Sequence, residues 1–323
     1  MGLFRKGNAG PAPSRLYFAT DLHGSEVCFR KFLHASDAYR ATTVIMGGDC
    51  TGKMLVPVVA GGDAYRCTWH GEQLSFGDDN GELAAVEKQI NDAGFYAARL
   101  SEEEYAHLSA DPAAMHERFS REMCDRLEQW CELASERLGD SEVRMIASPG
   151  NDDEFEIDQV LEDAPFVEPG QDQVIRIGAH EMISICWSNP TPWDTPRECA
   201  EEELAAKIDA AAAGIEDMAN AIFNLHVPPY GTGLDEAPKL DAEQRMEAAG
   251  AMAAVGSTAV RDAILNYQPL LSLHGHIHES KGVQKLGRTT CINPGSVYGE
   301  GSLLGVTVDL TDQRVASYSL TAG

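Results

Sequence analysis

Short apolar runs that end abruptly in polar or glycine-rich residues recur along this chain. Runs of this kind are typical of strands that are buried on both faces of a parallel sheet. They cover residues 16–19, 43–46, 143–147, 183–186, 221–225 and 270–273. Because the carboxyl ends of parallel strands gather at one edge of a sheet, we expect the polar residues that follow these runs to meet there.

Helical periodicity fills the intervals between the runs. An apolar stripe over residues 115–138 lies between the start signal Asp-Pro at residues 111–112 and a stop signal at Gly139. Residues 82–93 and residues 255–265 also predict helices. The fold class is therefore expected to be α/β, with buried strands alternating with helices.

The domain organisation is predicted from the same pattern. Residues 54–76 alternate between apolar and polar around a Gly-Gly pair, which predicts a short β-excursion. We predict a flexible segment over residues 1–14 and a single domain over residues 15–323, with a β/helical insertion at about residues 54–140.

Composition limits the partners and the compartment. The chain has 51 acidic and 25 basic residues, a formal charge of −26, which opposes binding of a long nucleic acid. No apolar run is long enough to span a membrane, and the polar N-terminus does not read as a signal peptide. The eight scattered cysteines suit a reducing compartment. We therefore predict a cytoplasmic protein without a membrane partner.

Polar clusters at five strand ends indicate a metal site. Each cluster is weak alone, because Asp-x-His and Gly-Asp are also ordinary turn sequences, and a single histidine is more often a hydrogen-bonded residue than a ligand. Together they supply the imidazole nitrogens and the carboxylate and amide oxygens that bind divalent transition metals. The clusters are Asp21-Leu22-His23, Gly48-Asp49, Gly150-Asn151, His226 and Gly275-His276-Ile277-His278.

These five clusters resemble the signature blocks of the calcineurin-like metallophosphoesterases, and the resemblance spans residues 21–278. Residues 189–192 and 293–296 are further similar to bacterial and archaeal members of predicted function. The resemblance implies a metallophosphoesterase-like four-layer α/β/β/α sandwich, in which two mixed β-sheets are flanked by helices.

The resemblance also implies a cofactor of two metal ions, divalent or of mixed valence, with manganese, iron and zinc as the candidates. The first ion would be held by Asp21, His23, Asp49 and His278, and the second by Asp49, Asn151, His226 and His276. Asp49 would bridge the two, because a carboxylate has two oxygens. Ions about 3.5–4 Å apart can deprotonate a shared water, orient phosphate oxygens and stabilise charge during in-line attack.

The third block departs from the family pattern. The family usually carries a histidine after the asparagine, which is thought to protonate the leaving group, whereas Asp152 follows Asn151 here. We predict catalytic roles for His23 and Asp152, although Asp152 is an acid only if nearby charge raises its pKa, and cations would lower it. A metal-bound water or another histidine could replace it, and a good leaving group needs no acid. Asn151 and Arg197 are predicted to bind substrate.

The predicted function is hydrolysis of a small phosphodiester or phosphomonoester by metal-bound hydroxide. Protein Ser/Thr phosphatases match poorly, because the three residues after Asp49 are Cys50-Thr51-Gly52 in place of a basic phosphate clamp. The alternative is a catalytically weak metallophosphoesterase-fold protein that serves as a protein-binding module. No oligomeric state is predicted.

Several nearby residues are expected to have structural roles. His274 lies two residues before His276 and would point to the same side of an extended segment, so it is a candidate support for the ligands. Residues 293–296 predict a turn that braces the site. Cys50 is predicted to be a small buried residue, and His180, which matches no block, is predicted at the surface.

Overall fold

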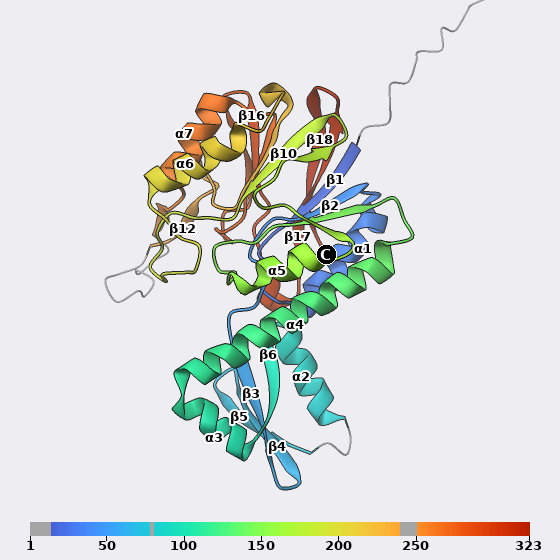
Figure 1. The fold of residues 1–323 in the computed structure, drawn as a ribbon, viewed down its shortest axis with the longest axis vertical. Coiled ribbons are helices and arrows are strands. Elements are labelled where there is room, and N and C mark those ends of the chain that lie inside the picture. Colours follow the sequence, from blue (N-terminus) through green and yellow to red (C-terminus); the bar gives the residue numbers. More distant parts are fainter. Residues whose placement is uncertain (1–13, 78–80, 240–250) are drawn as a thin grey trace, which may run out of the picture.

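A computed structural model describes residues 14–77, 81–239 and 251–323. Two mixed sheets pack face to face, with helices on both outer sides (Figure 1). This is the four-layer α/β/β/α sandwich that the resemblance implies, and the fold class is confirmed. The predicted flexible segment lies outside the described residues except for Ser14, at which the first strand begins.

The first sheet has the strand order β18-β17-β1-β2-β7-β8. Strands β1, β2, β7 and β8 are parallel, whereas β17 pairs antiparallel with both β1 and β18. The sheet is mixed for this reason. The bounds are β1 Ser14–Ala19, β2 Thr43–Met46, β7 Arg144–Ala147, β8 Val167–Pro169, β17 Leu304–Thr311 and β18 Arg314–Ala322.

The second sheet has the strand order β15-β16-β14-β11-β10-β9. Its central strands β16, β14, β11 and β10 are parallel, and the two edge strands are antiparallel to their neighbours. The bounds are β9 Ile175–Ile177, β10 His180–Ile185, β11 Ile222–Leu225, β14 Leu271–Leu273, β15 Gly282–Leu286 and β16 Thr289–Asn293.

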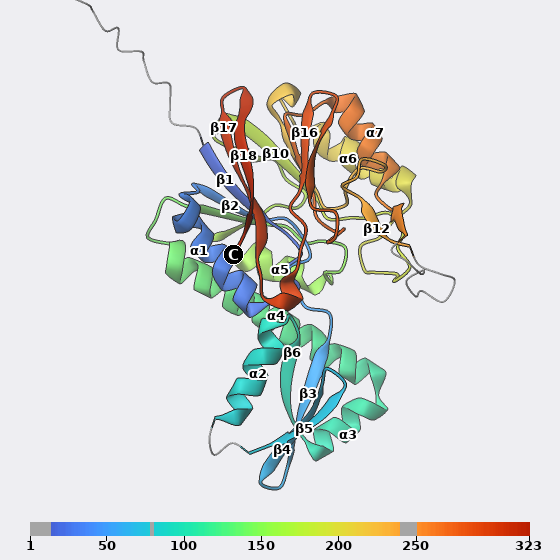
Figure 2. The same ribbon diagram turned by 180° about the vertical axis from the view of Figure 1, so that it is seen from behind.

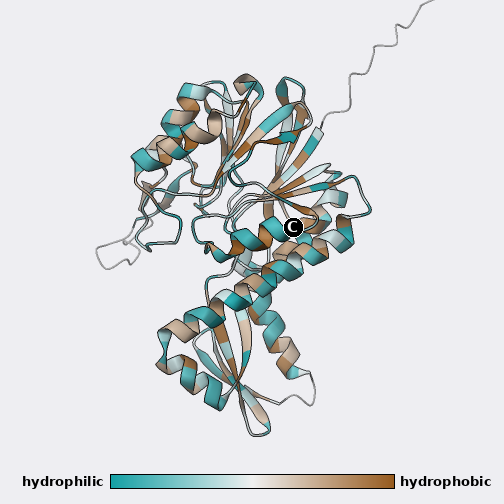
Figure 3. Cartoon of the chain, viewed as in Figure 1, coloured by the Kyte–Doolittle hydropathy of each residue, from teal (hydrophilic) through white to brown (hydrophobic). Residues whose placement is uncertain are grey.

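Alternation along the strands explains the layers. Leu16 and Phe18 of β1 point between the sheets and pack with Met182 and Ile222 of the second sheet. The intervening Tyr17 belongs to the core beneath the outer helices. Both faces of each central strand are therefore buried, as expected of continuous apolar runs. Figure 3 shows apolar residues along the strands of both sheets and hydrophilic residues alternating with apolar ones on the helices.

Helices cover the outer face of each sheet. On the first sheet they are α1 Glu26–Tyr39, α4 Pro112–Leu138 and α5 Glu156–Asp163, and on the second they are α6 Glu201–Ala212 and α7 Thr258–Tyr267. Two short 3-10 helices span Met218–Asn220 and Tyr298–Glu300. Strands β12 (Glu236–Pro238) and β13 (Met252–Ala254) form a small antiparallel pair.

A separate small sheet interrupts the chain between β2 and β7. It has the order β5-β4-β3-β6 and projects away from the sandwich, as both Figure 1 and Figure 2 show. Its elements are β3 Leu55–Gly61, β4 Ala64–Trp69, β5 Glu72–Phe76, α2 Glu82–Asp92, β6 Tyr96–Ser101 and α3 Glu102–Ala110. Helix α4 starts beside this sheet and ends against the sandwich, so the long helix connects the two.

The predicted helices are present, and the start of one of them differs from its predicted position. Helix α4 begins at Pro112, where the Asp111 carboxylate accepts hydrogen bonds from the first-turn amides, and α2 covers the predicted range. Helix α7 begins at Thr258 and not at residue 255, because the Ser257 side chain caps it by accepting from the amide of Val260. Of the helices described, none has the length and apolar character needed to span a membrane.

Candidate metal centre

Backbone hydrogen bonds link the loops that carry the predicted ligands. The ladder between β1 and β2 continues past the strand ends, where the amide of Asp21 donates to Gly48 O and that of His23 donates to Asp49 O, both at 2.9 Å. On the second sheet, the amide of Gly275 donates to His226 O, also at 2.9 Å. The predicted clusters therefore meet at one edge of the sandwich.

Four of the predicted ligands have left-handed backbones. Asp21, His23, Asp49 and His276 have φ angles of 55°, 45°, 48° and 65°. Such conformations cost about 1–3 kcal/mol each in residues other than glycine and persist only where surrounding structure holds them. Their concentration at this edge is the pattern expected of a functional site rather than of a set of unrelated turns.

The first group of ligand atoms comes from Asp21, His23, Asp49 and His278, and these atoms all lie within 4.8 Å of one another. Nε2 of His23 lies 3.1 Å from Nε2 of His278 and 3.5 Å from Oδ2 of Asp49. Ligands that share one ion at ~2.0–2.2 Å are separated by roughly 3 to 4 Å. The residues therefore fit a single divalent cation.

The second group gathers around the amide oxygen of Asn151. Its Oδ1 lies 2.6 Å from Nδ1 of His276 and 3.0 Å from Nε2 of His226, and the same Nε2 lies 3.3 Å from Oδ1 of Asp49. The two oxygens of the Asp49 carboxylate thus face different groups. Asn151, His226 and Asp49 are buried, whereas His276 and His278 are half-buried and lie on the open side.

The charges in the site also suit a cation. Burial opposes ionisation of Asp21, but the hydrogen bond and charge of His278 outweigh it and lower the pKa of Asp21 to about 2. Burial would lower the pKa of His226, yet the adjacent Asp49 carboxylate raises it to about 9. The buried carboxylates of Asp21 and Asp49 are therefore ionised, and they place negative charge at the point where the ligand atoms converge.

Close backbone approach makes the second group compact. A Cβ atom on Gly150 would lie 2.2 Å from Oδ1 of Asp49 and 2.8 Å from Cε1 of His226. No side chain larger than hydrogen fits between the loops at this position, so the glycine before Asn151 is a steric requirement of the site.

Comparison with known proteins bears on the fold. No family model matches the chain. The uncharacterized protein MJ1162 of Methanocaldococcus jannaschii is 29% identical over 154 residues, which cover 47% of this chain and 64% of that protein, less than two thirds of its length.

Solved structures align over almost the whole chain. One crystal structure aligns with a TM-score of 0.58 at 13% identity, and TT1561 of Thermus thermophilus aligns with a TM-score of 0.53 at 14% identity. Both alignments cover 96% of this chain and 98% of the other. An archaeal phosphodiesterase covers 96% of the chain at 11% identity, but its TM-score of 0.38 is too low to establish a common fold.

The structure combines two mixed sheets, helices on both outer faces, and candidate metal ligands at one edge. The chain has the fold of the calcineurin-like metallophosphoesterases. The resemblance predicted from the five clusters is confirmed at this level.

Lys53 is a residue of this metallophosphoesterase fold that the sequence reasoning missed. Its ammonium group forms an ion pair with Oδ2 of Asp152, and its side chain is 47% exposed. Burial lowers the pKa of Lys53, but the adjacent carboxylates of Asp152 and Asp49 raise it overall, so Lys53 is cationic. The only sequence signal was its position four residues after Asp49, beyond the positions where a phosphate clamp was sought.

Asp152 and His23, the two predicted catalytic residues, lie next to each other. Oδ2 of Asp152 is 3.9 Å from Nδ1 of His23. Burial and the Asp49 carboxylate raise the pKa of Asp152 to about 6, against the opposing effect of Lys53. Burial keeps the pKa of His23 well below its usual value, so its imidazole is neutral and has a lone pair for a metal.

Arg197, predicted to bind substrate, lies behind the ligand loop. Its side chain is buried, donates to the carbonyl oxygens of Asp153 and Glu154 at 2.7 and 2.9 Å, and pairs with Asp158 at 2.7 Å. These contacts hold the chain just after Asn151. A direct contact between Arg197 and a substrate stays a prediction, and Lys53 is the more exposed cation.

Asp153 joins the second and third blocks, and the sequence reasoning did not identify it. Its buried carboxylate accepts from the amides of Cys50, Thr51 and Gly150 at 2.8–2.9 Å. This single side chain therefore fixes the loop of Asp49 relative to the loop of Asn151. A buried carboxylate in this role is visible only after the loops have been brought together.

The other expected structural roles have mixed outcomes. His274 is buried, and its Nδ1 forms a hydrogen bond of 2.8 Å with the carbonyl oxygen of Leu225, the last residue of β11. This contact supports the strand end that precedes His226. In the predicted turn, Ser296 donates to Asp21 O at 2.7 Å and so braces the site. Cys50 is buried as predicted. The prediction for His180 is wrong: it is buried, with its two ring nitrogens 2.8 and 3.0 Å from backbone carbonyl oxygens.

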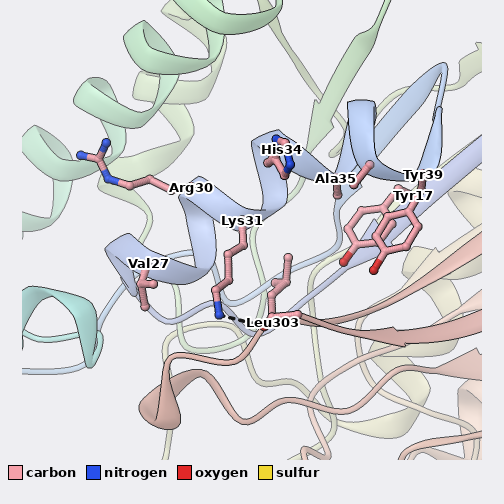
Figure 4. A pocket seen from close by; sticks show the side chains of 10 residues that line it. Tyr17, Val27, Arg30, Lys31, His34, Ala35, Tyr39 and Leu303 are labelled. Carbon is pink, nitrogen blue, oxygen red and sulfur yellow. Dashed lines mark hydrogen bonds between the residues drawn. The ribbon is translucent and has the colours of Figure 1, made fainter.

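A cavity of about 410 Å³ lies elsewhere, between α1 and the C-terminal strands (Figure 4). Tyr17 and Tyr39 stack at one end of it, and Lys31, which donates to the Gly323 carbonyl, also lines it. None of the seven predicted ligands lines this cavity. It is therefore separate from the candidate metal centre.

Proposed function

We propose that this protein is a metal-dependent phosphoesterase that hydrolyses a small phosphodiester or phosphomonoester. The observation that carries the proposal is the position of Asp49, whose Oδ1 faces His226 while its Oδ2 faces His23. A carboxylate held between two groups of neutral and anionic ligands suits a bridging role between two cations. Asp21, His23, Asp49 and His278 would hold one ion, and Asp49, Asn151, His226 and His276 the other.

Two bound cations would supply Lewis-acid activation of a water and stabilisation of charge on the phosphate. The imidazole and carboxylate donors suit manganese, iron or zinc. Asn151 contributes a neutral oxygen, which keeps the site less negative than a further carboxylate would. Lys53, cationic and half-exposed at the rim, is placed to attract the phosphate and to neutralise charge on it during attack.

A small substrate is favoured by the charge of the molecule. The formal net charge of −26 repels a long polyanion, whereas a single phosphate group needs only the local positive field of the ions and Lys53. The cytoplasm remains the predicted compartment.

The proposal is tested by metal content and hydrolysis measured together. Protein loaded with manganese, zinc or iron should retain two ions per chain and should cleave bis(p-nitrophenyl) phosphate or p-nitrophenyl phosphate. Removal of the ions with a chelator should abolish cleavage, and readdition should restore it. A chain that binds no metal would contradict the proposal. A chain that binds two ions and cleaves neither ester, nor any of a panel of phosphoesters, would instead favour the protein-binding alternative.

A further inference from the structure

The loop over residues 188–199 closes on the strand end that carries Asn151. Ser188 and Arg197 pair through a backbone hydrogen bond of 3.0 Å, which makes the loop a closed ring. The amide of Arg197 then donates to Asn151 O at 3.1 Å. The ring is thereby fixed beside the third ligand block.

Within this ring, the Glu198 carboxylate accepts hydrogen bonds from the hydroxyl and amide groups of two threonines. Its carboxylate accepts from the amide of Thr191 at 2.8 Å and from the amide of Thr195 at 2.9 Å. It also accepts from the hydroxyls of both, at 2.5 Å for Thr191 and 2.6 Å for Thr195. These four hydrogen bonds favour the ionised form and lower the pKa of Glu198 although partial burial opposes this.

The Thr195 hydroxyl has a single proton, and the bond to an ionised carboxylate uses it. Its oxygen can therefore only accept from a second partner. That partner is the side-chain amide of Asn151, whose Nδ2 lies 2.8 Å from Oγ1 of Thr195. The direction of this bond fixes which end of the amide is NH₂ and which is the carbonyl oxygen.

We propose that Thr195, held by Glu198, is a positioning residue that orients the Asn151 amide so that Oδ1 points at the second metal site. The inference rests on the proposed function, because it concerns that metal site. An unrestrained amide can rotate by half a turn and present its NH₂ group, whose lone pair is delocalised and cannot bind a metal, to the side of His226 and His276. The hydrogen bond from Nδ2 to Thr195 opposes that rotation.

Three variants test the proposal. Thr195→Val removes the hydroxyl with little change of volume, and Thr195→Ser keeps it. Thr191→Val is the matched control, since Thr191 donates to the same Glu198 oxygen but makes no hydrogen bond to Asn151. For each, bound manganese or zinc per chain and the dissociation constant of each ion are measured by competition with a chromogenic chelator, alongside thermal unfolding.

We expect Thr195→Val to raise the dissociation constant of one of the two ions by about 10- to 100-fold, the usual effect of losing a residue that orients a ligand. Thr195→Ser and Thr191→Val should bind both ions with affinities close to those of the wild type. Wild-type affinity for both ions in Thr195→Val, or an equal loss in Thr191→Val, would overturn the inference while leaving the proposed function intact. A wild-type chain without metal would overturn both.

Discussion

Lys53 and Asp152 form an ion pair directly beside the candidate metal centre, and Asp152 stands at the position where the resemblance to the calcineurin-like metallophosphoesterases predicts a histidine. The pair has a consequence for substrate binding, because a half-exposed ammonium group at the rim can exchange its carboxylate for a phosphate. Charge-assisted hydrogen bonds of this kind contribute roughly 1.5–3 kcal/mol.

Replacing this lysine should therefore weaken substrate binding. We expect Lys53→Gln to raise the KM for p-nitrophenyl phosphate about 10-fold or more without loss of bound metal, measured by steady-state kinetics and metal analysis. Lys88→Gln is the control, since Lys88 also pairs with an aspartate but lies on α2, far along the chain from the ligands. Equal KM values for Lys53→Gln and the wild type would exclude a role for Lys53 in binding phosphate.

The absence of a histidine after Asn151 predicts a particular selectivity for leaving groups. If no residue protonates the departing oxygen, activated aryl esters should be cleaved far better than alkyl esters, because general acid catalysis contributes ~10²–10⁴-fold. Asp152→Asn should then change little on either class, and Asp152→His should speed the alkyl esters. A series of esters run on wild type and both variants measures this. A large loss in Asp152→Asn confined to alkyl esters would identify Asp152 as the acid.

The bridging position of Asp49 predicts unequal effects on metal content. Asp49→Asn should reduce bound metal below one ion per chain, because it removes negative charge from both ligand groups at once. Asn151→Ala should leave close to one ion per chain, since it removes a neutral donor from the second group alone. Elemental analysis after dialysis against a defined free-metal concentration gives both values. Equal stoichiometry in the two variants would speak against bridging.

The close packing at Gly150 predicts a steric effect on the same site. The methyl group of Gly150→Ala would lie 2.2 Å from Oδ1 of Asp49, so the two loops must separate. We expect at least one ion to be lost and activity to fall more than 100-fold, roughly the cost of misplacing a catalytic group by about 1 Å. Gly299→Ala, where no atom lies within 4 Å of the added carbon, is the control and should match the wild type.

The hydrogen bonds to Glu198 predict a stability difference that depends on pH. Its pKa is lower in the folded protein than its ordinary value of 4.5, so its contribution is fully present above about pH 4.5 and is lost as the pH falls through the folded-state pKa. Glu198→Gln should lower the free energy of unfolding by about 1–2 kcal/mol at pH 7. Chemical denaturation at a series of pH values should show the gap closing towards acid pH. A gap that is unchanged at pH 3.5 would contradict this assignment.

The meeting of the candidate ligand clusters at one edge could be predicted because each cluster lies shortly after the end of a buried strand. A buried apolar run fixes where a strand ends, and the parallel order of neighbouring strands brings Asp49 and Asn151 to the same edge. The start of α4 could be predicted from an equally local signal, since its capping residue Asp111 and its first residue Pro112 are adjacent in the sequence. Local signals of this kind do not depend on knowing the tertiary structure.

The remaining features depend on contacts between distant segments. Asp153 accepts from amides about 100 residues earlier in the chain, and the buried ring of His180 is satisfied by carbonyl oxygens of Asn220 and Thr311, which lie 40 and 131 residues away. Every residue of strand β18 is exposed or half-exposed, so no apolar run marks it, yet it completes the first sheet. The sequence around each of these residues carries no sign of its partner.

The division of the candidate ligands between the two sheets would set an order of events during biogenesis. Asp21, Asp49 and Asn151 follow strands of the first sheet, whereas His226, His276 and His278 follow strands of the second. An ion that needs donors from both sheets can bind only after the interface between them has formed. If the proposed ions bind here, the chain must reach its packed state before it acquires them, and its newly synthesised form would fold without their help.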